Sequence, residues 1–227
     1  MDINIHRDYY GIGYDLYKTD KLSLLPGLSV LVGCNGSGKS TLLHQLRDKL
    51  EEKKIPFLSY DNLKDGQNNA MQHALNVSGD INLLATLATS SEGEQISINF
   101  GKFVRDVGAF VKKNSPSNKE VFVLLDAVDS GLSIDLVQEF KSFFKFAVDK
   151  EKENGVDLYF VVSSNEYELC ENSQCLVLPD LKYTTFTNYN DYRQSIMDSR
   201  EYKDNGIKFI SRKTNRPELD PVFEREI

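Results

Sequence analysis

The chain has 227 residues, of which 40% are hydrophobic and 27% charged, and its formal net charge at pH 7 is −7. A chain of this length buries roughly 70% of the surface of its unfolded form, and no Pro-, Gly- or Ser-rich linker divides it, so we expect one domain over residues 1–227. The negative charge excludes a general electrostatic attraction to nucleic acid, and no apolar run approaches the roughly 18 to 20 residues that cross a bilayer.

The first residues, MDINI, lack the basic start and apolar core of a secretory signal peptide. We therefore expect a cytoplasmic protein without a membrane partner. The chain has three cysteines, at Cys34, Cys170 and Cys175. An odd number without CxxC spacing argues against a disulfide framework and against a zinc site, so we expect ordinary reduced thiols.

Residues 1–32 mix short apolar alternations with turn signals at Gly11, Gly13 and Pro26. This pattern predicts a few antiparallel strands. Residues 28–32, LSVLV, form a short apolar run that contains β-branched residues and predict one further strand.

Residues 33–40 read GCNGSGKS and match the pattern G-x-x-x-x-G-K-[ST] at every fixed position. Leu43, Leu46 and Leu50 repeat at helical spacing directly afterwards, so a strand leads into a glycine-rich turn and then a helix. In such a unit the backbone N–H groups and the helix N-terminus converge on phosphate oxygens, the lysine reaches the β and γ phosphates, and the hydroxyl binds Mg²⁺. The sequence therefore predicts binding of ATP and Mg²⁺, and a glycine-rich turn without a ligand is the alternative. The candidate residues are Asn35, Gly36, Ser37, Gly38, Lys39, Ser40 and Thr41.

Strands and helices alternate in the rest of the chain. The pattern predicts strands over residues 55–60, 121–125, 158–162 and 175–178, an amphipathic helix over 97–113, and a helix that includes 136–144. This alternation predicts an α/β fold with a parallel sheet. Residues 61–69 are polar and predict a loop.

Residues 121–125, VFVLL, form a continuous apolar run that ends at Asp126. A carboxylate at this point completes the magnesium shell together with Ser40. The alternative is an acid that only caps the strand.

Two further segments resemble motifs of ATP-binding cassette (ABC) ATPases. Residues 126–133, DAVDSGLS, resemble the D-E-x-x-S-G-L-[DS] segment, and residues 89–95, TSSEGEQ, resemble the signature motif, which soluble members often write S-S-G-E-Q. Glu92 stands where glycine is usual. With the glycine-rich loop, the three motifs follow the family's order over about residues 25–180.

The helix after the signature begins ISINF and lacks the Arg- and Ala-rich sequence of transporter cassettes. The chain is therefore similar to the soluble branch, which includes the ATPase heads of chromosome-maintenance and double-strand-break-repair proteins and phage or bacterial defence ATPases. The stretch between Lys39 and Asp126 is too short for a coiled-coil arm.

The resemblance implies a P-loop NTPase fold of ABC type: a mostly parallel central sheet flanked by helices, with N-terminal antiparallel strands. Residues 1–32 would form these strands, 33–182 the nucleotide-binding core and 183–227 a C-terminal extension. It also implies a head-to-tail homodimer around two Mg-ATP, which couples the ATP cycle to an unknown protein or nucleic-acid partner in DNA repair, phage replication or defence. The residues that would complete the partner's site are Ser91, Gly93 and Glu94, and a further magnesium ligand would be Gln67, with Asn62 as its competitor.

Two positions depart from the family pattern. Ala127 stands where the family has the glutamate that activates the attacking water, and Asn165 stands where transporter cassettes have a histidine that contacts the γ-phosphate. A general base is worth about 10² to 10⁴ in rate, so we expect ATP binding with slow or no hydrolysis. Asn165 keeps a hydrogen-bond donor and loses any acid–base role, and a turn asparagine is its alternative interpretation.

Ala127 leaves two explanations open. Either the chain is a non-hydrolysing, ATP-dependent regulatory module, or the alanine was introduced to trap the bound state, and the otherwise intact motifs favour the second. A transporter cassette is a weaker alternative. Four tyrosines could stack on adenine, namely Tyr9, Tyr10, Tyr14 and Tyr17. Residues 203–216 carry local positive charge, which we interpret as a solvated surface rather than a nucleic-acid contact.

Overall fold

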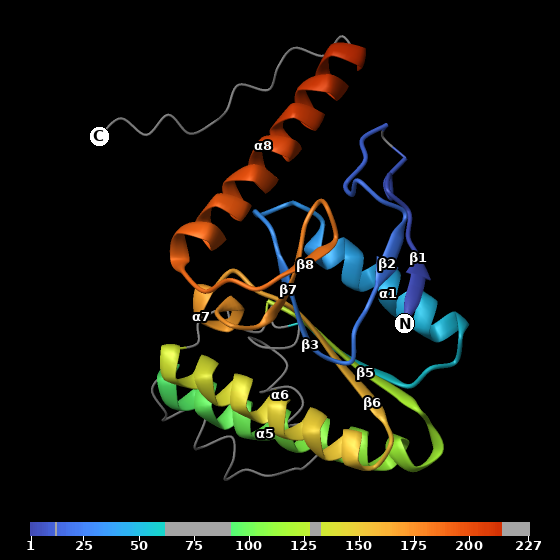
Figure 1. The fold of residues 1–227 in the computed structure, drawn as a ribbon, viewed down its shortest axis with the longest axis vertical. Coiled ribbons are helices and arrows are strands. Elements are labelled where there is room, and N and C mark those ends of the chain that lie inside the picture. The colour runs from blue at the N-terminus through green and yellow to red at the C-terminus, as the bar shows by residue number, and fades with distance from the viewer. Residues whose placement is uncertain (12, 62–91, 128–132, 215–227) are drawn as a thin grey trace.

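The computed structural model describes residues 1–11, 13–61, 92–127 and 133–214 (Figure 1). Its centre is a six-stranded sheet in the order β4-β5-β6-β3-β7-β8. The strands are β3 (Gly27–Val32), β4 (Phe57–Asp61), β5 (Glu120–Asp126), β6 (Asp157–Ser163), β7 (Gln174–Val177) and β8 (Lys182–Thr184). All neighbours pair in parallel except β8, which runs antiparallel to β7. The predicted α/β fold with a mostly parallel sheet is confirmed.

A separate two-stranded sheet lies at the N-terminus. It consists of β1 (Asp2–Asn4) and β2 (Lys21–Ser23), which pair antiparallel. The predicted N-terminal antiparallel strands are thus confirmed, whereas β3 belongs to the parallel sheet.

The helices form layers on the two faces of the large sheet. They are α1 (Lys39–Glu52), α5 (Glu92–Asn114), α6 (Ile134–Glu153), the short α7 (Tyr167–Cys170) and α8 (Tyr189–Thr214), with a 3₁₀ turn, η2 (Ser115–Ser117), after α5. α5 and α6 lie together on one face, α1 and the β1–β2 pair lie on the other, and α8 extends away from the sheet (Figure 1). Among the described residues, no helix is long and apolar enough to cross a membrane.

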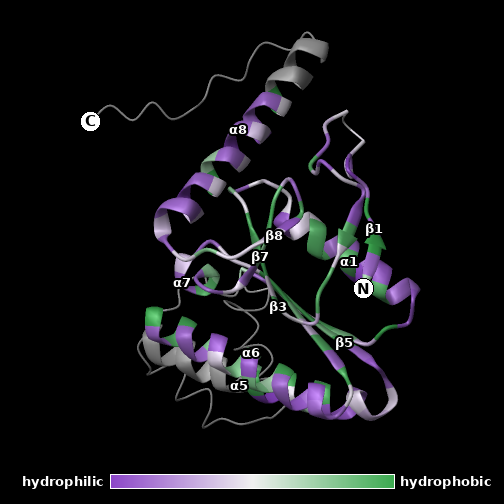
Figure 2. Ribbon diagram, in the orientation of Figure 1, coloured by the Kyte–Doolittle hydropathy of each residue, from purple (hydrophilic) through white to green (hydrophobic). Residues whose placement is uncertain are grey.

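Strand β5 shows why the sheet is buried on both faces. Val121, Val123 and Leu125 pack in the cluster beneath α5 and α6, whereas Phe122 and Leu124 pack in the cluster beneath α1. Because successive side chains point to opposite faces, a continuous apolar run suits a strand with helices on both sides. The strands of the sheet are hydrophobic, whereas α8 is mostly hydrophilic (Figure 2).

Helix α5 begins at Glu92, five residues before the start that the apolar stripe predicts. The apolar stripe shows only the part of the helix that packs on the sheet. The first turn, residues 92–95, reads EGEQ and has no apolar side chain, so the stripe could not reveal it. Residues 92–95 of the signature-like segment therefore form the beginning of the helix instead of preceding it. Strand β4 begins at Phe57 rather than at residue 55, and helix α8 occupies the region that the sequence defined only as an extension.

Candidate functional site

The glycine-rich loop, residues 33–40, connects the carboxyl end of β3 to the start of α1. Strand β3 is a central strand, with β6 on one side and β7 on the other. Parallel α/β sheets bind ligands at the carboxyl ends of their strands, where the loops meet. The loop therefore occupies the edge of the sheet at which a site is expected.

Lys39 is the first residue of α1, and its side chain is turned back beneath the loop. It is buried, and its ammonium group donates hydrogen bonds to the carbonyl oxygens of Gly33 at 2.6 Å and Cys34 at 3.3 Å. A third bond runs to Oδ1 of Asn165, at 3.1 Å. Asn165 follows the end of β6, so the structure brings together two residues that the sequence singled out separately.

Gly38 caps the N-terminus of α1 in the left-handed region, with φ of 100°. Tyr17 is fully buried beside it, and the tyrosine hydroxyl donates to the Gly38 carbonyl at 2.8 Å. A Cβ atom at Gly38 would lie 3.1 Å from that hydroxyl, so both the backbone angle and the close approach favour glycine. Burial raises the pKa of Tyr17, which keeps the phenol protonated as a donor.

Three hydroxyl groups lie in or next to the loop. The Ser37 hydroxyl is buried and has no hydrogen-bond partner among the described residues, an arrangement that costs about 1 to 3 kcal/mol. Ser40 is exposed on the first turn of α1. Thr41 Oγ1 lies 3.0 Å from the hydroxyl of Tyr10. The loop thus holds hydroxyl donors besides its lysine, and this donor set fits an anionic ligand.

Asp126 is the last residue of β5, and Ser163 is the last residue of β6, the strand between β5 and β3. The Ser163 hydroxyl donates a hydrogen bond to Oδ1 of Asp126 and accepts one from the backbone N–H of Ala127 at 2.8 Å. Ala127 has a φ of 51°, a left-handed conformation that costs about 1 to 2 kcal/mol in an L-residue. Ser163 therefore orients both the candidate magnesium ligand and the residue after it.

Ser40 and Asp126 both lie at the carboxyl edge of the sheet, as the magnesium prediction requires. No group of three or more His, Cys, Asp and Glu side chains gathers among the residues that the structure describes. Mg²⁺ does not need such a group, because it is commonly held by one or two protein oxygens together with phosphate oxygens and water. The third candidate ligand, Gln67, and its competitor Asn62 lie outside the described residues.

The four tyrosines that could stack on adenine differ in accessibility. Tyr17 is fully buried, and Tyr14 packs against Tyr202 of α8 with ring centroids 6.1 Å apart. Burial, with a smaller contribution from Tyr202, raises the pKa of Tyr14 to about 12. Tyr9 and Tyr10 are 39% and 61% exposed, and only an exposed ring can stack on a base. Tyr14 and Tyr17 thus act as packing residues.

Helix α8 makes contacts to the site that the sequence did not predict. Ser199 Oγ accepts the backbone N–H of Cys34 at 3.2 Å, and Lys203 Nζ donates to the carbonyl of Asn35 at 2.9 Å. Tyr192 donates to the carbonyl of Asn165 at 2.8 Å. The expectation that residues 203–216 form only a solvated surface is wrong for Lys203, which is half-buried against the loop.

The signature-like segment is described in part. Gly93 and Glu94 lie in the first turn of α5, whereas Ser91 and residues 128–132 of the DAVDSGLS segment lie outside the described residues. The three cysteines are buried, and the Cys175 thiol donates to the carbonyl of Cys170 at 3.3 Å.

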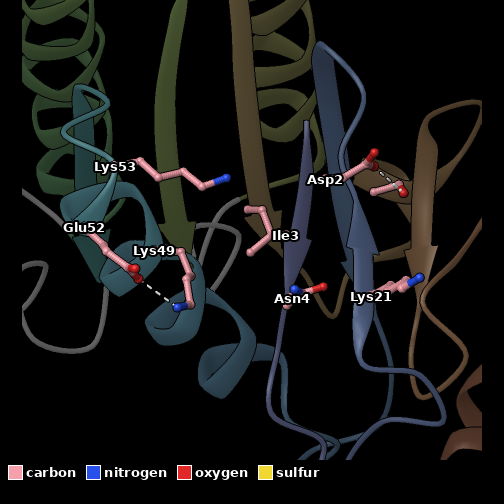
Figure 3. Close-up of a pocket in the computed structure, with 8 residues that line it drawn as sticks. Asp2, Ile3, Asn4, Lys21, Lys49, Glu52 and Lys53 are labelled. Carbon is pink, nitrogen blue, oxygen red and sulfur yellow. Dashed lines mark hydrogen bonds and ion pairs between the residues drawn. The ribbon is translucent and has the colours of Figure 1, made fainter.

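A hollow of about 490 Å³ lies away from this site, between the β1–β2 pair and the last turns of α1 (Figure 3). Its charged side chains are of both signs, and several of them pair with neighbours. Lys49 bonds to Glu52 at 2.7 Å, and the Ser23 hydroxyl donates to Asp2 at 2.7 Å. Because the charges are of both signs and several are paired, the hollow does not favour a ligand of either charge.

Comparison with protein-family models gives no match to this chain, and a search of curated proteins gives none either.

Proposed function

We propose that the chain is a soluble ABC-type ATPase that binds ATP with Mg²⁺ in the glycine-rich loop. The observation that carries the proposal is the position of Lys39. Its buried ammonium group lies beneath the loop at the N-terminus of α1 and contacts Asn165, at the edge of the sheet that also holds Asp126. A helix N-terminus, a loop with backbone amides and a lysine together favour polyphosphate.

Each residue then has a distinct role in the proposed site. Lys39 and the loop amides bind the phosphate oxygens, except the Ser37 N–H, which donates to the Cys34 carbonyl at 3.1 Å, and Thr41 lies beside them on α1. Ser40 and Asp126 hold Mg²⁺, which neutralises charge on the phosphates when it is bound. Asn165 orients the Lys39 ammonium and offers an amide donor towards the terminal phosphate.

Ala127 determines what the chain does with bound ATP. Its methyl group cannot accept a proton from water, so the residue contributes no general base. The site therefore binds ATP without efficient turnover. This observation favours a second candidate function, an ATP-dependent regulatory module that does not hydrolyse ATP.

A substitution of Lys39 tests the proposal. We expect Lys39→Ala to weaken Mg-ATP binding by roughly 100-fold, about 3 kcal/mol, because a buried charged donor is lost from the phosphate site. The matched control is Lys49→Ala, on the same helix, whose ammonium pairs with Glu52 at the surface. Titration with a fluorescent ATP analogue measures both variants. Equal affinities for Lys39→Ala and Lys49→Ala contradict the proposal.

We further propose that two chains close head to tail on two ATP molecules, with the segment at residues 91–94 completing the partner's site. This rests on the resemblance of the motifs and on the place of Gly93 and Glu94 in the first turn of α5, where backbone N–H groups are available to an anion. Closure would act on an unidentified protein or nucleic acid. Sizing the chain with and without Mg-ATP tests this assembly, and a monomer at saturating ATP contradicts it.

A further inference from the structure

Helix α8 presents one face to the glycine-rich loop. Tyr192, Ser199 and Lys203 have the spacing i, i+7, i+11, which places them along one side of a helix. Ser199 is 2% exposed and Tyr192 is 6% exposed, whereas Arg193 and Arg200 on the same helix are exposed. The buried side of α8 is therefore the side that touches the candidate site.

Two of the α8 contacts, those of Ser199 and Lys203, are to the backbone of the loop, and they fix the direction of the loop's peptide groups. Lys203 holds the carbonyl oxygen of Asn35, so that oxygen faces α8. In a trans peptide the C=O and the following N–H point in opposite directions, so the N–H of Gly36 points away from α8. Ser199 meanwhile accepts the N–H of Cys34. Anion-binding loops depend on such fixed N–H directions.

Glycines on both sides permit this close approach. A Cβ atom at Gly33 would lie 3.1 Å from Ser199 Oγ, and one at Gly36 would lie 3.1 Å from Lys203 Nζ. Within α8 itself, a Cβ atom at Gly206 would clash with the ring of Tyr14. Glycine is disfavoured in helix interiors, so Gly206 fits a position where the helix must lie directly against its neighbour.

The same helix also holds the segment opposite the loop. Tyr192 donates to the carbonyl of Asn165, and the side chain of Asn165 accepts from Lys39. One helix thus contacts both segments that meet at the Lys39 ammonium. We propose that Tyr192, Ser199 and Lys203 are positioning residues, through which docking of α8 and binding of Mg-ATP strengthen each other.

This inference rests on the proposed function, and coupling between two sites is reciprocal. If docked α8 holds the loop in its binding conformation, then bound ATP must stabilise the docked helix to the same extent. Typical couplings change affinity by 5- to 150-fold. We therefore expect Lys203→Met to weaken Mg-ATP binding roughly 10-fold, with a similar direction for Ser199→Ala.

The test compares matched variants of the full chain. Arg200→Met is the control, because Arg200 is an exposed cation on the same helix, and it should bind Mg-ATP within about twofold of the unaltered chain. Lys203→Arg should restore binding, since it keeps a cationic donor. Rescue of this kind separates a specific contact to Asn35 from general loss of helix packing.

Hydrogen exchange on the unaltered chain gives an independent reading. Mg-ATP should slow amide exchange in residues 192–203, and Lys203→Met should reduce that protection. If ATP binds in a Lys39-dependent manner while α8 exchange and the Lys203→Met affinity stay unchanged, the role of α8 is overturned and the proposed function stands. If the unaltered chain binds no ATP, both are overturned.

Discussion

The two halves of the candidate site, which lie on either side of the end of β6, are built very differently. The glycine-rich loop contacts Tyr17, Asn165 and α8, which lie far apart in the sequence and fix its backbone from several directions. At the other half, Asp126 and Ala127 share the hydroxyl of Ser163, and position 127 ends in a methyl group. The contacts between distant segments therefore gather at the loop that we propose binds the ligand, whereas Ala127, at the proposed water-activating position, carries no base.

The largest effect should come from introducing a base at position 127. We expect Ala127→Glu to raise the rate of phosphate release by about 10² to 10⁴, with little change in ATP affinity, because a general base acts on the chemical step. Ala127→Gln is the matched control, since its amide has the same size but takes up no proton. Equal rates for the two variants would support the non-hydrolysing module instead.

A smaller effect is expected at Asp126, the proposed magnesium ligand. Asp126→Asn should remove most of the gain in ATP affinity that Mg²⁺ provides, roughly 10- to 100-fold, because an amide oxygen is a weaker ligand than a carboxylate. Titrations in Mg²⁺ and in EDTA measure that gain. Glu120→Gln, at the opposite end of β5, is the control. An unchanged gain in Asp126→Asn places the metal elsewhere.

The exposed tyrosine beside Thr41 should contribute less. We expect Tyr10→Ala to weaken ATP binding about fivefold, since base–aromatic stacking is worth about 1 to 3 kcal/mol. Inorganic triphosphate has no base, so its affinity should not change. Tyr10→Phe should keep most ATP affinity, because it removes only the bond to Thr41. An equal loss for ATP and triphosphate means that Tyr10 acts on the loop and not on the base.

The smallest effect concerns the packing of Tyr14 against Tyr202 of α8. Burial raises the pKa of Tyr14 to about 12, above its ordinary value of 10.0, so the folded chain holds this proton more tightly than the unfolded chain does. The resulting stabilisation is complete below pH 10 and is lost as the pH rises towards 12. Urea unfolding between pH 9 and pH 11 should therefore show a shallower decline for Tyr14→Phe than for the unaltered chain. Identical declines contradict the burial of Tyr14 against α8.

Local sequence signals predicted the elements that lie next to each other in the chain. The apolar run before residue 33 and the leucine spacing after residue 40 are enough to predict β3, the loop and α1. The same holds for β5 and its terminal Asp126, because a strand buried on both faces reads as a continuous apolar run.

The contacts that join distant segments could not be predicted in this way. Ser163, Ser199 and Lys203 are common residue types in polar surroundings, and their partners lie far away in sequence. Helix α8 is mostly hydrophilic, so its sequence has no apolar stripe that would indicate which face contacts the loop (Figure 2). One weak signal was available: β6 ends at Ser163 and Ser164 follows it, and two hydroxyls at the carboxyl end of a buried strand favour a site there.

The most direct test of binding without turnover is to identify the nucleotide that the unaltered chain retains. The chain is incubated with Mg-ATP, separated from free nucleotide, denatured, and the released nucleotide is identified by chromatography. We predict intact ATP in a fixed ratio to the chain, and none from Lys39→Ala. Retention of no nucleotide, or steady conversion of ATP to ADP by the unaltered chain, would contradict the assignment of the loop or of Ala127.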